Sequence, residues 1–196
     1  MLRPASPLRH LPNLISALRM VLVVPIVWAL LDRRLELAIG LFLVAGVSDA
    51  VDGFLAKQFG WASRLGGILD ALADKFLLVS TFLCLWWLGV FPGWLVLWVL
   101  ARDVLIIGGG IVYNSWIERF VPEPSPVSKL NTFLQIVLAA LGVVHLGITP
   151  VADWLLHVLM GAVALTVFFS GAGYVREWTR RAALRRHARD GASHGE

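Results

Sequence analysis

Cysteine and charged residues are both scarce in this sequence. Its single cysteine, Cys84, stands inside an apolar run, which excludes an intrachain disulfide framework and a zinc site built from several cysteines. Charged residues make up only 15% of the chain, against about 25% in soluble domains. Because 58% of the residues are hydrophobic, the chain needs lipid around it. The net charge is +4, and many of the positive charges crowd at the C-terminus, a pattern that favours a membrane surface over nucleic acid as a partner.

Six long apolar runs follow one another along the chain, each close to the roughly 20 residues that cross a bilayer core. None alternates with period 2, and all are far longer than ordinary strands, so helices are predicted. The sequence therefore predicts an all-α polytopic membrane protein, with residues 1–196 forming a single domain. The predicted transmembrane helices cover residues 14–31, 35–54, 65–89, 94–113, 130–146 and 154–174.

Basic residues are unequally divided between alternate loops. Lysine and arginine gather in the N-terminal segment, the second and fourth loops and the tail, whereas the intervening loops hold only Arg33 and Arg34. By the positive-inside rule, both termini are cytoplasmic. The basic tail, residues 176–196, keeps helical spacing; it either marks topology as a solvated end or lies on anionic headgroups.

Four carboxylates interrupt the second and third apolar runs, where a charge costs about 3 kcal/mol or more. Asp49 and Asp52 are three residues apart, and Asp70 and Asp74 are four apart, so each pair shares a helix face. Since the two helices are antiparallel, all four acids share one depth near the cytoplasmic side. They would repel each other unless divalent cations neutralised them, and ligands without His or Cys favour Mg²⁺ or Mn²⁺. Protonated aspartates that hydrogen-bond the helices together are the structural alternative.

Small residues surround these acids. Gly53 and Ala56 follow Asp52, and Gly66 and Gly67 precede Asp70. They either let the helices approach closely or open room for a nucleotide and its phosphates.

As one string, this region reads Asp49-x2-Asp52-Gly53-x2-Ala56-Lys57-x8-Gly66-x3-Asp70-x3-Asp74. It resembles the signature of the CDP-alcohol phosphatidyltransferases, D-x2-D-G-x2-A-R-x8-G-x3-D-x3-D, at seven of its eight fixed positions. The six helices with cytoplasmic ends also resemble this family. Lys57 is the departure, because lysine keeps the charge of the family's arginine but loses its planar fork.

The resemblance implies a fold, a reaction and a set of roles. The four aspartates would hold two divalent cations, Mg²⁺ or Mn²⁺, and Asp74 would also act as the general base. An acceptor alcohol would attack CDP-diacylglycerol at the phosphorus that bears the diacylglycerol group and expel CMP. The resemblance further implies a homodimer. We expect the protein to lie in a bacterial inner membrane, and the topology places the active site toward the cytoplasm. The residues that would border the cytidine diphosphate are Gly53, Ala56, Lys57 and Gly66.

Acceptor choice depends on residues outside the signature. Arg102-Asp103 in the fourth run and Ser128-Lys129-Leu130-Asn131-Thr132-x2-Gln135 in the fifth resemble the cardiolipin synthases of the family. The branch that uses glycerol 3-phosphate has G-K-x-K-T here, with a second lysine in place of Asn131. Both branches share the stretch from Pro12-Asn13-Leu14 to Arg19.

Loss of that lysine favours phosphatidylglycerol, a monoanionic diester, over the more highly charged glycerol 3-phosphate as acceptor. Arg102 and Lys129 are the candidates for binding the acceptor phosphate, with Asn131 and Thr132 as neutral donors. An ion pair with Asp103 is the alternative role for Arg102, and an interfacial, snorkelling position is the alternative for Lys129.

A divalent-cation transporter is the alternative from another functional class, since intramembrane carboxylates also mark ion pathways. The outer halves of the two acidic helices, residues 37–47 and 76–87, contain no charge and only Ser80 and Thr81 as polar side chains. A pocket open on one side therefore fits the sequence better than a path through the membrane.

Overall fold

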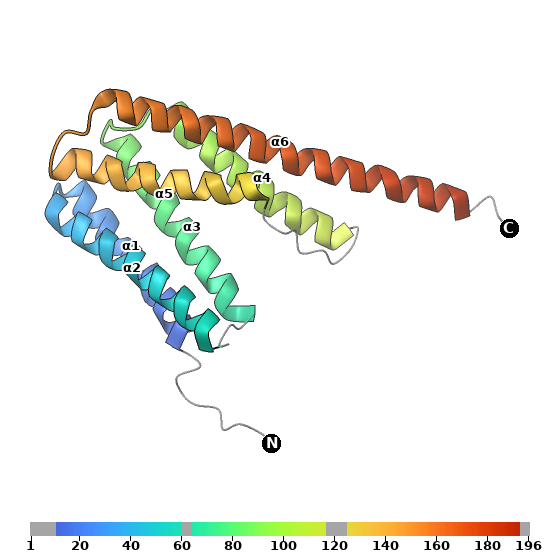
Figure 1. The fold of residues 1–196 in the computed structure, drawn as a ribbon, viewed down its shortest axis with the longest axis horizontal. Helices are drawn as coiled ribbons and strands as arrows, with labels where there is room; N and C mark the ends of the chain where they lie inside the picture. The colour runs from blue at the N-terminus through green and yellow to red at the C-terminus, as the bar shows by residue number, and fades with distance from the viewer. Residues whose placement is uncertain (1–10, 60–63, 117–124, 193–196) are drawn as a thin grey trace, which may run out of the picture. The chain divides into compact units, whose positions relative to one another are not determined.

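The computed structural model describes residues 11–59, 64–116 and 125–192, and in these ranges the regular secondary structure is entirely helical. The all-α prediction is therefore confirmed, and the order of helices along the chain is the predicted one (Figure 1). The helices are α1 (Leu11–Leu31), α2 (Leu35–Phe59), α3 (Arg64–Trp87), α4 (Gly93–Trp116), α5 (Pro126–Gly147) and α6 (Asp153–Ala192).

Three stretches within the described residues are long and apolar enough to cross a membrane: Leu14–Leu31, Pro126–Gly147 and Asp153–Arg176. No more than 33% of any of these spans is buried inside the protein. Large apolar side chains such as Val24 and Trp154 are instead exposed, at 70% and 68%. Apolar surface of this extent on the outside of a packed protein suits a lipid environment.

Capping interactions explain two of the places where the observed helix ends differ from the predicted ones. α3 ends at Trp87 rather than residue 89, because Gly89 adopts a φ of 80° and Val90 N–H donates to Leu85 O at 2.8 Å. α5 begins four residues earlier than predicted, at Pro126, where proline suits the first helical turn. There the Ser125 hydroxyl accepts a hydrogen bond from Ser128 N–H at 3.2 Å.

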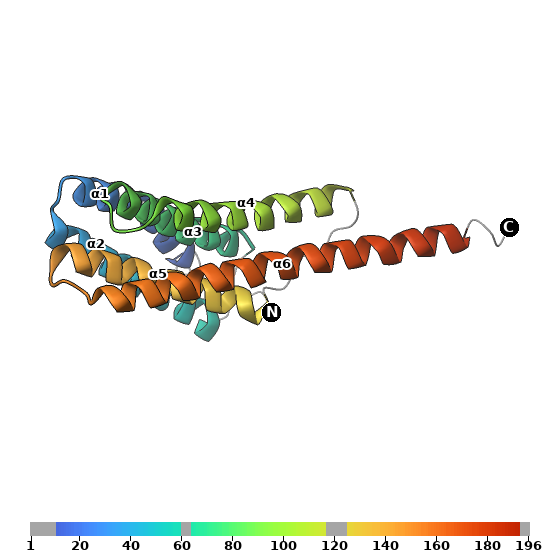
Figure 2. The same cartoon turned by 90° about the horizontal axis from the view of Figure 1, so that it is seen from above.

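The last helix continues far beyond the apolar run that predicted it. α6 runs without a break from Asp153 to Ala192, through most of the basic tail (Figure 2). The helical spacing of the basic residues in the tail thus corresponds to a helix in the structure, up to Ala192.

The chain forms two compact units. The first comprises Met1–Pro92 with Ile136–Leu156, and the second comprises Gly93–Gln135 with His157–Glu196. In the first unit α1 packs against both α2 and α3. Gly142 lets α5 approach α3 closely, because a Cβ there would lie 2.8 Å from Leu85 and 2.9 Å from Phe91. These contacts hold together the helices that carry the acids.

Candidate functional site

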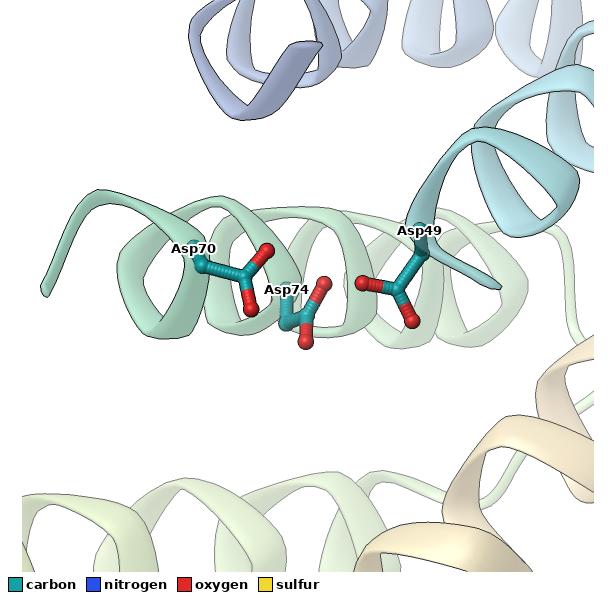
Figure 3. A group of neighbouring side chains, drawn as sticks. All are labelled: Asp49, Asp70 and Asp74. Atoms are coloured by element: carbon teal, nitrogen blue, oxygen red, sulfur yellow. The ribbon is translucent and has the colours of Figure 1, made fainter. Parts of the chain in front are cut away.

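Three aspartates from two helices of the first unit converge on one point. Asp49 comes from α2, and Asp70 and Asp74 come from one face of α3 (Figure 3). One carboxylate oxygen from each lies within 4.8 Å of the others. Their side chains are 43%, 39% and 41% exposed, so a solute can reach them. The structure thus brings together three of the four predicted metal ligands; the side chain of Asp52, in α2, lies outside the described part.

A buried arginine from α1 reaches the same three acids. Arg19 Nη1 donates to Asp49 Oδ1 at 2.7 Å and to Asp70 Oδ1 at 3.1 Å, and it also pairs with Asp74 Oδ1. Only 1% of the Arg19 side chain is exposed. One turn earlier on α1, Ser16 Oγ donates to Asp70 Oδ1 at 3.4 Å. The acids therefore face outward, while α1 supplies a positive charge from the protein interior.

The sequence interpretation gave Arg19 no role beyond the pattern shared by two branches of the family. The signal was nevertheless available, because an arginine inside an apolar run needs an acidic partner or an aqueous cavity. Spacing along the chain could not identify which acids those were, since Arg19 and Asp74 are 55 residues apart.

The three carboxylates fit a divalent cation of the Mg²⁺ or Mn²⁺ type. The donors are all oxygens, and octahedral ligands at about 2.1 Å from an ion lie roughly 3 to 4 Å apart, within the spread seen here. Even with Arg19 beside them, the three carboxylates carry two negative charges in excess, which attract a divalent cation. The cluster can thus bind a cation and bring it to an anionic substrate at the exposed side.

The other residues predicted around the acids lie in the same two helices. Gly53 and Gly66 are half-buried in α2 and α3. Outside its own helix backbone, a Cβ added at Gly53 or Gly67 would meet no described atom within 4 Å. Among the described residues, no close packing contact therefore requires glycine at these two positions. Ala56 and Lys57 lie in α2, and their side chains are outside the described residues.

A second polar cluster ties together three helices of the second unit. Arg102 from α4 donates from Nη1 to Asp103 Oδ1 at 2.8 Å, and from Nη2 to Ser128 Oγ at 2.5 Å and Ser170 Oγ at 2.8 Å. All four residues are buried. The ion pair with Asp103, one of the two roles that the sequence left open for Arg102, is present.

The buried face of α5 continues this cluster with two amide side chains. Asn131 Oδ1 accepts a hydrogen bond from Thr166 Oγ1 at 3.0 Å, and Gln135 lies one turn further along α5. Within the described residues, Arg102 Nε, Asn131 Nδ2 and both polar atoms of Gln135 are buried without a hydrogen-bond partner. These groups are available to a polar ligand or to water, because burying them unpaired costs about 1–3 kcal/mol each.

Of the remaining two acceptor candidates, Lys129 lies apart from this buried face, whereas Thr132 is half-buried one turn after Ser128. Lys129 is exposed, whereas its neighbour Ser128 is buried, so the two side chains project from different sides of α5. Thr132 Oγ1 donates to the Ser128 carbonyl at 3.2 Å. The sequence interpretation quoted Gln135 without a role and missed Ser170, a small polar residue in an apolar helix.

Comparison with known proteins gives this arrangement a context. A family model described as CDP-alcohol phosphatidyltransferase matches residues 9–169, which include both polar clusters apart from Ser170. The chain is 32% identical over 184 residues to "CDP-diacylglycerol--glycerol-3-phosphate 3-phosphatidyltransferase 1, chloroplastic" of Oryza sativa subsp. japonica, covering 84% of this chain and 56% of that protein.

Two further relatives carry different names. Over 149 residues the chain is 32% identical to "Cardiolipin synthase (CMP-forming)" of Rattus norvegicus, covering 66% of this chain and 48% of the rat protein. Over 172 residues it is 32% identical to "Probable phosphatidylglycerophosphate synthase" of Mycobacterium tuberculosis, covering 85% of this chain and 80% of that protein. The chain thus spans about half the length of the rice and rat relatives.

Proposed function

The chain belongs to the CDP-alcohol phosphatidyltransferase family, and we propose that it moves a phosphatidyl group from CDP-diacylglycerol to an alcohol acceptor with release of CMP. The observation that carries this proposal is the convergence of Asp49, Asp70 and Asp74 at an exposed point of the first unit. A cation-binding cluster open to solutes is what transfer from a diphosphate requires, because the chemistry is mainly positioning and charge neutralisation.

All four acids of the signature serve as metal ligands, and one of them also serves as the base. Asp49, Asp52, Asp70 and Asp74 hold two Mg²⁺ or Mn²⁺ ions. Bound there, the ions neutralise the diphosphate and the charge that develops on the leaving group. Gly53, Ala56, Lys57 and Gly66 border the cytidine diphosphate, and the open space beside Gly53 supports this assignment.

Asp74 is the proposed general base, and its exposed carboxylate supports a direct contact with the acceptor. It takes the proton of the acceptor hydroxyl, whose oxygen forms a bond to the phosphorus that bears diacylglycerol. The bond between that phosphorus and the oxygen of CMP breaks, and CMP leaves.

The proposed acceptor is phosphatidylglycerol, which would make the protein a cardiolipin synthase. Arg102, Lys129, Asn131 and Thr132 are the proposed acceptor residues. The unpartnered donors Arg102 Nε and Asn131 Nδ2 support binding of an oxygen-rich group. Glycerol 3-phosphate is the alternative acceptor. The relative named cardiolipin synthase and the relative named phosphatidylglycerophosphate synthase are both 32% identical to this chain.

All six helices are proposed to cross the inner membrane of a bacterial cell, with both termini and the acidic cluster on the cytoplasmic side. The protein is proposed to form a homodimer there. The topology can be tested with cysteines introduced at two exposed positions, Gln58 and Thr149. In intact spheroplasts a membrane-impermeant maleimide should label Thr149→Cys, and it should label Gln58→Cys only after permeabilisation. Labelling of Gln58→Cys in intact cells would contradict this orientation. Native mass spectrometry of the purified protein tests the dimer.

The activity is tested by incubating the purified protein with CDP-diacylglycerol, Mg²⁺ or Mn²⁺, and one acceptor at a time. Mass spectrometry should detect CMP together with cardiolipin when phosphatidylglycerol is supplied. Uptake of Mn²⁺ into proteoliposomes without nucleotide, and without CMP formation in the parallel assay, would instead support the transporter.

A further inference from the structure

Arg19 holds the acidic cluster from the side opposite to that open to solutes. A single nitrogen, Nη1, contacts the Oδ1 atom of all three aspartates, and the arginine is buried while the acids are not. A cation that arrives from the exposed side therefore meets carboxylates that are already paired with one guanidinium group.

We propose that Arg19 is a built-in counter-ion that competes with divalent cations for Asp49, Asp70 and Asp74, so that cation binding displaces Nη1 from them. This inference rests on the proposed role of the cluster as a metal site. In this role Arg19 sets the affinity of the cluster for cations and takes no part in catalysis.

Competition follows from where Nη1 lies. Its contacts, 2.7 Å to Asp49 and 3.1 Å to Asp70, put it near the point where an ion bound by the same oxygens at about 2.1 Å would sit. Two positive charges roughly 3 Å apart repel strongly where water is partly excluded. The guanidinium and the ion therefore cannot hold the same three oxygens at once.

Displacing Arg19 also has a cost, because a buried guanidinium loses partners that compensate for its removal from water. That cost lowers the affinity of the cluster for cations. If Arg19 instead gathered the carboxylates for the ion, its removal would weaken cation binding. The two roles thus predict opposite signs for one measurement.

The measurement is the Kd for Mn²⁺, obtained from the electron paramagnetic resonance signal of free Mn²⁺ titrated into the purified full chain. Arg19→Gln should bind Mn²⁺ about tenfold more tightly than the unmutated protein, since close charge pairs couple by at least this factor. Without Mn²⁺ the variant should melt at a lower temperature, and Mn²⁺ should raise its melting temperature more than that of the unmutated protein.

Arg34→Gln is the matched control. Arg34 is an exposed arginine beyond the end of α1, and its ion pair is with Asp32, which lies outside the acidic cluster. Its Mn²⁺ affinity should be unchanged. Equal or weaker Mn²⁺ binding by Arg19→Gln would overturn the competition. Should that variant lose its helical circular dichroism, Arg19→Lys serves instead: its shorter reach should also tighten binding, and weaker binding would contradict the proposal.

Asp70→Asn separates failure of this inference from failure of the proposed function. Undiminished Mn²⁺ binding by Asp70→Asn would show that the cluster is not the metal site. Loss of binding in Asp70→Asn, combined with no gain in Arg19→Gln, would leave the metal site standing and remove only the competition.

Discussion

The two polar clusters of this protein are each built around a buried arginine, yet they present opposite chemistry. Arg19 meets three half-exposed carboxylates from two other helices, so negative charge is left over at an accessible point. Arg102 pairs with the neighbouring Asp103 and with two serines, all of them buried. The first cluster is suited to a cation, whereas the second has balanced charge and spare donors suited to an oxygen-rich ligand. Burial of an arginine alone therefore does not indicate what a site binds; the excess charge around it does.

The largest effect is expected from Asp74→Asn, which removes the proposed base and one cation ligand while keeping the side chain's size. Transfer should fall by about a thousandfold or more, since a positioned base alone contributes about 10²–10⁴. CMP release from CDP-diacylglycerol measures it, with circular dichroism as the control for folding. Turnover like that of the unmutated protein would remove Asp74 from the mechanism.

Arg102→Met should have the largest effect on stability, because it leaves Asp103 buried without its cation. Removing one partner of a buried ion pair costs about 3–5 kcal/mol. Thermal unfolding in detergent should show a clearly lower melting temperature for Arg102→Met, which Mn²⁺ does not restore. For Arg19→Gln, in contrast, Mn²⁺ should restore the melting temperature. Restoration of Arg102→Met by Mn²⁺ would erase the distinction between the two clusters.

Part of this arrangement was predictable from the sequence and part was not, for physical reasons. The helices and the pairing of Asp70 with Asp74 follow from local periodicity, which a sequence displays directly. Ser125 and Pro126 carry a readable start signal for α5, which the hydropathy of the run beginning at residue 130 obscured. The bond from Arg102 to Ser170 spans 68 residues and depends on which helices pack together, so local spacing could not reveal it.

Asn131→Lys should change acceptor preference without abolishing transfer. A second lysine at the start of α5 would face the extra charge of glycerol 3-phosphate, and such a charged contact is worth about 1–3 kcal/mol. The preference for phosphatidylglycerol over glycerol 3-phosphate, measured as the ratio of kcat/KM values, should narrow by up to about a hundredfold. If the unmutated protein already prefers glycerol 3-phosphate, the branch assignment is wrong, and the role of the acids stands.

Lys57→Arg should have the smallest effect, because it restores the family residue and keeps the charge. KM for CDP-diacylglycerol should stay the same or fall, since arginine can bind a phosphate with two parallel hydrogen bonds. A collapse of activity would show that the nucleotide site is adapted to lysine.

The central claim, that the acidic cluster carries a cation-dependent phosphatidyl transfer, is tested most directly by one measurement on the purified protein. CMP and lipid products are quantified after incubation with CDP-diacylglycerol and phosphatidylglycerol, with Mn²⁺, with excess EDTA, and with Mn²⁺ added back after EDTA. The account predicts CMP and cardiolipin in equal amounts with Mn²⁺, neither with EDTA, and recovery of both when Mn²⁺ is restored. Transfer that persists in EDTA would contradict it.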